Sequence, residues 1–173
     1  GFTSWSCVRV SSTLQSKIMG SKSDADNDES FMRLALRHAQ HAFREKEVPI
    51  GAVIVEDCSG LVLASARNCV EGIQDPTAHA EINCIRTACE VRRNWRLSDC
   101  TLYTTLEPCP MCMGAINAAR IKRVVYGATD ERLGATGGGY LDMTATQHPF
   151  HSVQLEGGML AEESVQLMQR FFR

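Results

Sequence analysis

The chain has 173 residues, of which 44% are hydrophobic and 22% charged, and its formal net charge is -2. This composition indicates a globular protein and excludes a disordered or fibrous chain, as well as one with a strong overall basic field. Eight scattered cysteines favour a reduced intracellular compartment over a disulfide-rich secreted domain, and no apolar run is long enough to span a membrane.

The first 29 residues have the composition of an extension rather than of a folded domain. Residues 1–23 contain no acidic residue and are rich in Ser and Thr, as organelle transit peptides are. We expect residues 1–29 to be a disordered N-terminal extension or the remnant of a transit peptide, with Met19 as a possible start. Residues 30–173 then form one domain. The expected compartment is the cytoplasm, or a plastid or other organelle if the stretch is a transit peptide.

Helix and strand patterns alternate from residue 30 onward. Apolar residues recur at helical spacing after Ser30, with Asp28 and Ser30 as possible caps. Short apolar runs predict strands over residues 48–57 and 61–68, joined as a hairpin, and further strands over 100–108, 121–128 and 151–158. Helices are expected over residues 75–94, 109–120 and 160–172. This order predicts an α/β fold in which helices cover both faces of a mixed sheet.

Two segments carry side chains that favour metal chemistry. Cys109 and Cys112 form a C-x-x-C pair at a helix start, where both thiolates face one point and the helix N-terminus favours their ionisation. His79 also lies near a helix start, and in such sheets helix N-termini gather at one edge. Two cysteines and one histidine leave a fourth zinc position open, which is the arrangement of a catalytic site. A thiol redox pair is the alternative interpretation of Cys109 and Cys112.

Glu81 lies two residues after His79, close enough to reach water at the metal without ligating it. Zinc lowers the pKa of bound water to ~7, and a carboxylate beside it can pass the proton to a leaving nitrogen. The alternative interpretation of Glu81 is a surface carboxylate. The combination of H-x-E with a later P-C-x-x-C is a known signature of zinc nucleobase deaminases.

The chain resembles the tRNA-specific adenosine deaminases of the bacterial and plastid type, within the cytidine-deaminase-like superfamily. The resemblance extends over nearly all of residues 30–173 and includes EVPIGAVIV, DPTAHAEI, NWRLSDCTLYTTLEPCPMC and ARIKRVVYGATD. It implies a cytidine deaminase-like three-layer α/β/α sandwich with a five-stranded mixed sheet, one Zn²⁺ per subunit and a homodimer. It also implies zinc-dependent deamination of adenosine to inosine at the wobble position of tRNA, with the anticodon stem-loop as partner and without a nucleotide cofactor.

The resemblance also assigns roles to individual residues. It gives the zinc ligands as His79, Cys109 and Cys112, with Glu81 as the proton shuttle. It gives the substrate contacts as Asn68, Ala80, Pro49, Ile50, Gly51 and Asp130. Taken by itself, Asn68 would be interpreted as a turn former, and Asp130 could equally be a loop carboxylate.

Two other functions share this zinc site. A guanine or cytosine deaminase would differ only in its pocket, and a non-catalytic zinc-binding partner subunit would not need Glu81. An RNA substrate calls for phosphate contacts, and the candidates for a basic stripe around one rim are Arg120, Lys122, Arg123 and Arg132.

Overall fold

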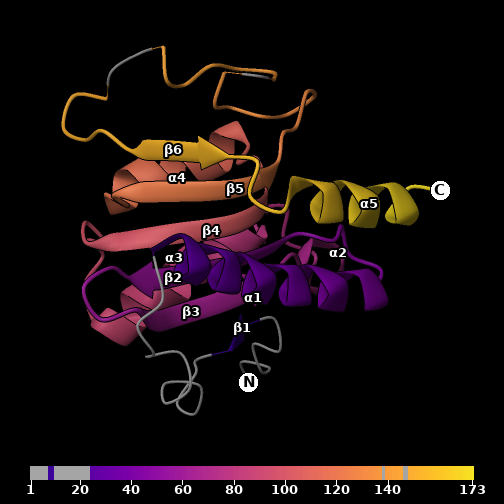
Figure 1. The fold of residues 1–173 in the computed structure, drawn as a ribbon, viewed down its shortest axis with the longest axis horizontal. Coiled ribbons are helices and arrows are strands. Elements are labelled where there is room, and N and C mark those ends of the chain that lie inside the picture. Colours follow the sequence, from indigo (N-terminus) through magenta and orange to yellow (C-terminus); the bar gives the residue numbers. More distant parts are fainter. Residues whose placement is uncertain (1–7, 10–23, 138, 146–147) are drawn as a thin grey trace.

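The computed structural model describes residues 8–9, 24–137, 139–145 and 148–173 (Figure 1). Its helices are α1 (Asp24–Arg44), α2 (Val70–Ile73), α3 (Ala80–Arg92), α4 (Pro110–Ala119) and α5 (Ala161–Phe171). Its strands are β1 (Val8–Arg9), β2 (Gly51–Glu56), β3 (Leu61–Arg67), β4 (Cys100–Leu106), β5 (Arg123–Ala128) and β6 (Gln154–Gly157). Most of the expected N-terminal extension, including Met19, lies outside the described residues.

The strands form one mixed sheet in the order β1-β3-β2-β4-β5-β6. Strand β2 pairs antiparallel with β3 and β4, whereas β4, β5 and β6 run parallel to one another. The five strands expected from the sequence are therefore confirmed as β2 to β6. The two-residue strand β1, which was not expected, pairs antiparallel with β3 at the edge of the sheet.

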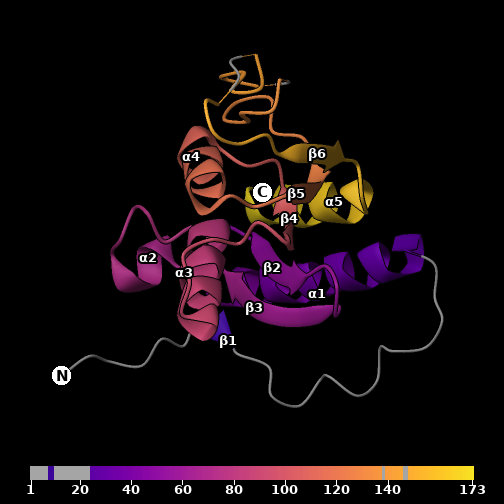
Figure 2. The same cartoon turned by 90° about the vertical axis from the view of Figure 1, so that its left-hand side faces the viewer.

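Helices cover both faces of the sheet, as predicted. Helices α1 and α5 lie on one face, and α3 and α4 lie on the other (Figure 2). Alternating strand residues point to the two faces, so Ile54 and Leu102 join the core beneath α3 and α4, while Val53 and Tyr103 pack beneath α1. The three-layer α/β/α sandwich is thereby confirmed. Within the described residues, no helix has the length and apolar character that a bilayer crossing requires.

Helix α1 begins at Asp24, before the predicted start at Ser30. Asp28 is therefore inside the helix and does not cap it. Its carboxylate accepts hydrogen bonds from Tyr103 Oη (2.5 Å) and from Arg123 Nη2 (2.6 Å), which ties α1 to β4 and β5. A local capping pattern does not reveal this role because both partners lie at least 75 residues away.

Helix α3 begins later than predicted, at Ala80 rather than near Asp75. Asp75 instead closes a tight turn, since its Oδ1 accepts hydrogen bonds from the backbone N–H (2.8 Å) and the hydroxyl (2.7 Å) of Thr77. The later start makes His79 the N-cap residue of α3, with extended backbone angles. It thus sets the histidine at the edge of the sheet where α4 also begins.

Candidate active site

The three predicted metal ligands meet between the first turns of α3 and α4. His79 is the N-cap of α3, Cys109 is the N-cap of α4, and Pro110 occupies the first turn of α4, where its missing N–H costs nothing. His79 Nδ1 lies 3.7 Å from Cys109 Sγ and 3.5 Å from Cys112 Sγ. All three ligand atoms lie within 4.8 Å of one another.

This donor set fits zinc. Imidazole nitrogen and thiolate sulfur are the ligands that zinc prefers, at about 2.0–2.3 Å. Ligand atoms at those distances around a tetrahedral centre lie roughly 3.3–3.8 Å apart, and both measured separations from His79 fall in that range. Because the protein supplies three ligands, one coordination position stays open for water or substrate.

The ligands also perturb one another's protonation. A hydrogen bond with Cys112, together with one from His79, lowers the pKa of the Cys109 thiol to about 4. The same contact, with burial, raises the pKa of Cys112, and the hydrogen bond with Cys109 raises the pKa of His79. Cys109 is therefore the thiol that ionises most easily, whereas Cys112 and His79 hold their protons, and a bound cation would displace protons from this group.

Glu81 lies in the first turn of α3 and is only 3% exposed. Its Oε2 is buried without a hydrogen-bond partner. Burial raises the pKa of this carboxyl, which keeps it closer to neutrality than a surface glutamate. A buried carboxyl oxygen with no partner beside a metal site is costly for stability, so its position argues for a chemical task.

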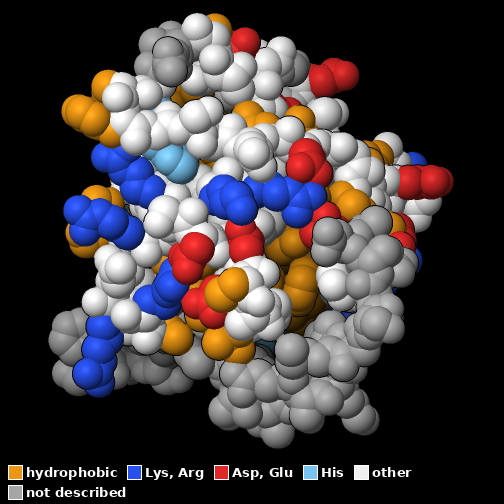
Figure 3. Space-filling view, turned by 60° about the vertical axis from the view of Figure 1, so that its left-hand side comes forward, with side chains coloured by type: hydrophobic (Ala, Val, Ile, Leu, Met, Phe, Trp, Pro, Cys, Tyr) orange, Lys and Arg blue, Asp and Glu red, His pale blue; other side chains and the backbone are white. Residues whose placement is uncertain are grey.

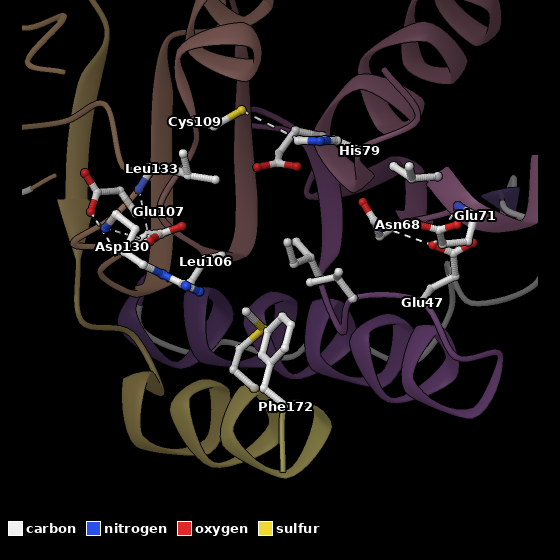
Figure 4. Close-up of a pocket in the computed structure, with 16 residues that line it drawn as sticks. Glu47, Asn68, Glu71, His79, Leu106, Glu107, Cys109, Asp130, Leu133 and Phe172 are labelled. Carbon is white, nitrogen blue, oxygen red and sulfur yellow. Dashed lines mark hydrogen bonds between the residues drawn. The ribbon is translucent and has the colours of Figure 1, made fainter. Parts of the chain in front are cut away.

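A cavity of about 290 Å³ opens beside these residues (Figure 4). His79, Glu81 and Cys109 line its inner end. One side is formed by the loop before β2 and the end of β3, and the opposite side by the loop after β5. The C-terminal helix α5 contributes Met168 and Phe172. The volume suits a single base rather than a large ligand.

The expected substrate contacts separate into two groups. Ile50, Asn68 and Asp130 line the cavity. Among the described residues, Pro49, Gly51 and Ala80 are buried but are not part of its lining.

Gly51 packs against helix α1 and does not line the cavity. A Cβ there would lie 2.0 Å from the carbonyl oxygen of Ala35 and 2.6 Å from the backbone nitrogen of Ala39. Glycine at this position lets α1 pack directly against β2, so its evident task is packing. Its role as a pocket wall stays a prediction.

Two buried glutamates in the cavity wall were missed by the sequence reasoning. Glu47, 3% exposed, accepts hydrogen bonds from the side chain of Asn68 and from the backbone after it. Glu107, 2% exposed, accepts hydrogen bonds from the backbone of Asp130 and from Thr136. The available signal was weak, since each is a lone glutamate beside a proline-containing turn, and such residues are usually exposed.

The four residues expected to form one basic stripe do not lie together. Arg132 lines the cavity. Arg123 is the first residue of β5. The other end of this strand leads to the cavity and lies about 16 Å from Arg123, at roughly 3.3 Å per residue. Its guanidinium is held by Asp28 and Glu156, each at 2.6 Å, and Lys122 pairs with Asp57 at 3.2 Å. On the face shown in Figure 3, basic and acidic side chains are interspersed. The expectation of one continuous stripe is therefore wrong.

The fold and the site define a class of enzyme that activates water at a metal held by His and Cys, beside a buried carboxyl. Comparison with known proteins agrees. The profile of the cytidine and deoxycytidylate deaminase zinc-binding region matches residues 25–128. The chain therefore belongs to this deaminase family.

Proteins that are similar to this chain include tRNA adenosine deaminases. The chain is 45% identical over 161 residues to the chloroplastic tRNA(adenine(34)) deaminase of Arabidopsis thaliana, which covers 84% of this chain and 12% of that longer protein. It is 41% identical over 143 residues to a tRNA-specific adenosine deaminase of Streptococcus pyogenes, covering 83% of this chain and 88% of that protein. A structure from a study of A-to-I editing by tRNA:A34 deaminases at the wobble position superposes with a TM-score of 0.75 at 43% identity, and covers 80% of this chain and 98% of the other.

Proposed function

We propose that this protein converts adenosine to inosine at the wobble position of a tRNA anticodon, consuming water and releasing ammonia. The observation that carries the proposal is the buried Glu81 carboxyl beside the three zinc ligands, in a cavity sized for one base. The names of the relatives in Arabidopsis thaliana and Streptococcus pyogenes support adenosine in tRNA as the substrate.

The residues of this chain divide the chemistry among them. When bound by His79, Cys109 and Cys112, zinc supplies a Lewis acid that acidifies water near neutral pH. Glu81 accepts a proton from water and returns it to the departing amine at Oε2, the oxygen without a partner. Asn68 holds the base from the side of β3, and the apolar wall around Ile50 excludes bulk water from the reacting end.

The wobble base lies in a single-stranded loop, so turning it into the cavity costs little unstacking energy. Asp130 and Arg132 lie at the side of the cavity formed by the loop after β5. We place the neighbouring nucleotide there, with Asp130 near its ribose and Arg132 near a phosphate. The logarithm of the binding affinity should fall linearly with the logarithm of the salt concentration. Each phosphate contact in a single strand should steepen this slope by about 0.7.

A homodimer through α4 is part of the proposal. This helix exposes Met111, Gly114 and Ala118, which share one side at helical spacing, next to the ligand Cys109. A Cβ at Gly114 would meet no heavy atom within 4 Å, so a partner can approach the backbone closely. Light scattering should show a dimer at micromolar concentration. A Gly114→Arg variant should be monomeric, and a wild-type monomer that still deaminates tRNA would contradict the dimer.

We also propose a plastid location. The acid-poor, Ser-rich composition of residues 1–23 and the word chloroplastic in the name of the Arabidopsis thaliana relative support it. A fluorescent protein fused after Arg173 should enter plastids. A cytosolic signal would contradict this location without affecting the enzymatic proposal.

The decisive assay incubates the zinc-loaded protein with total tRNA and sequences the anticodons, where inosine is read as guanosine. Parallel reactions with free guanine and free cytosine are followed by ammonia release. We expect inosine at position 34 of a tRNA, about one zinc per chain by elemental analysis, and no inosine from a Glu81→Ala control. Ammonia from guanine or cytosine without inosine in tRNA would mean that the chemistry is right and the substrate wrong. Activity in protein without zinc would contradict the mechanism.

A further inference from the structure

A carboxylate at the side wall of the cavity has no part in the chemistry described above. Glu47 lies in the loop between α1 and β2, and its side chain is almost fully buried. The nearby Glu45, in the same loop, has a side chain that is 53% exposed. Burying a carboxylate is costly unless hydrogen bonds compensate, so the contacts of Glu47 indicate its task.

All three hydrogen bonds accepted by Glu47 come from one short segment. Its Oε1 accepts from the backbone N–H of Gly72 (2.6 Å), and its Oε2 accepts from the backbone N–H of Glu71 (3.3 Å) and from Asn68 Nδ2 (3.2 Å). The two backbone groups belong to the first turn of α2, whose own N-cap, Cys69, makes no side-chain capping bond. Glu47 therefore caps α2 from a distant part of the chain.

The contact with Asn68 has a chemical consequence. A carboxylate only accepts hydrogen bonds, so the amide of Asn68 must turn its NH₂ group toward Glu47. The carbonyl oxygen of Asn68 is then left to point into the cavity toward His79, as Figure 4 shows. The backbone of Asn68 is also held, because its N–H donates to the carbonyl of Ile50 at 3.0 Å.

We infer that Glu47 is a positioning residue that determines which face of the Asn68 amide meets the base. Without it, the amide could rotate by half a turn and exchange its acceptor for a donor. The two orientations suit different base edges, so Glu47 contributes to the choice of base as well as to its placement. This inference rests on the proposed function only in taking Asn68 as a contact to the base.

The test is a double-mutant cycle on the full-length, zinc-loaded protein. Glu47→Gln is nearly isosteric but introduces an amide that can donate to the Asn68 oxygen and release the fixed orientation. We expect kcat/KM for deamination to fall about 10- to 100-fold, the loss of a hydrogen bond to a charged group. In an Asn68→Ala background the same substitution should add less than about 3-fold. The control Glu45→Gln should leave kcat/KM unchanged.

The cycle separates positioning from stability. A purely structural role in capping α2 would persist without the Asn68 side chain, so Glu47→Gln would then lower kcat/KM equally in both backgrounds. That outcome, or an unchanged kcat/KM for Glu47→Gln, would overturn the inference. Thermal midpoint and zinc content are measured for each variant.

A rescue experiment covers the case in which Glu47→Gln alone does not fold. In Asn68→Asp alone, two carboxylates face each other and neither can donate a hydrogen bond. When Glu47→Gln is added, the new glutamine amide donates to one oxygen of the new aspartate, and the other aspartate oxygen faces the cavity. The double variant should recover at least about 10-fold in kcat/KM over Asn68→Asp. A double variant no better than Asn68→Asp would overturn the inference. Both tests use whichever of tRNA or guanine the wild-type protein converts, so failure of the proposed substrate stays distinct from failure of the inference.

Discussion

Replacing Glu107 by glutamine should destabilise the protein and loosen the loop after β5. Glu107 Oε2 accepts a hydrogen bond from the backbone N–H of Asp130 (2.9 Å), and Oε1 accepts from the N–H (2.9 Å) and hydroxyl (2.7 Å) of Thr136. A glutamine has only one side-chain oxygen. Its NH₂ group must therefore face either the N–H of Asp130 or the N–H and hydroxyl of Thr136, so at least one part-buried backbone N–H loses its acceptor.

The expected magnitude follows from these contacts. Losing a hydrogen bond to a charged group costs about 1.5–3 kcal/mol, and the residue is only 2% exposed, so water does not compensate. A cost of about 2 kcal/mol corresponds to a thermal midpoint lower by about 4–8 °C for a domain of this size. The loop carries Asp130 and Arg132 of the cavity, so kcat/KM should fall as well.

The assay is thermal unfolding by circular dichroism on zinc-loaded protein, with deamination measured in parallel. Glu131→Gln is the matched control, because Glu131 lies in the same loop and is exposed. It should change the midpoint by less than about 2 °C, the usual range for a surface substitution. A Glu107→Gln midpoint within about 2 °C of wild type, or an equal loss in Glu131→Gln, would contradict this role of Glu107.

Three further predictions concern the chemistry, the packing and the pH dependence. Glu81→Gln should retain zinc by elemental analysis yet lose at least about 100-fold in kcat, since the proton carrier is gone; near-normal turnover would make Glu81 a bystander. Gly51→Ala should cost about 3 kcal/mol in urea unfolding, because the new Cβ would meet the Ala35 carbonyl at 2.0 Å; a loss below 1 kcal/mol would show that α1 moves easily. Burial raises the pKa of Asp28, but hydrogen bonds from Arg123 and Tyr103 outweigh it and leave that pKa lowered. The contribution of this carboxylate to the free energy of unfolding is therefore fully present above the unfolded-state pKa of about 3.9. It is lost as the pH falls through the lower folded-state pKa. The destabilisation by Asp28→Asn should be constant from pH 7 to 5 and shrink below about pH 4; a cost independent of pH would contradict the ion pair.

Elements with a strong local pattern were predictable. The strands β2 to β5 are short apolar runs bounded by turn residues, and α4 starts at a proline that suits a first helical turn. Helix boundaries were less predictable. By its residue type, Asp75 suits either a helix start or a turn. In the structure it accepts two hydrogen bonds from Thr77 and closes a turn, so α3 starts only at Ala80.

The sequence by itself indicated the two parts of the candidate centre, because each part is local. A C-x-x-C pair at a helix start brings two sulfur atoms together in any fold, and H-x-E sets a carboxyl near a histidine whatever surrounds it. Only the tertiary structure brought the two parts together, with His79 Nδ1 3.5 Å from Cys112 Sγ across 33 residues of sequence, and decided which side chains surround them. Glu47 serves a segment that begins 21 residues later, and Glu107 serves a loop that begins 23 residues later. Such partners depend on which strands become neighbours in the sheet, and no spacing along the chain encodes that.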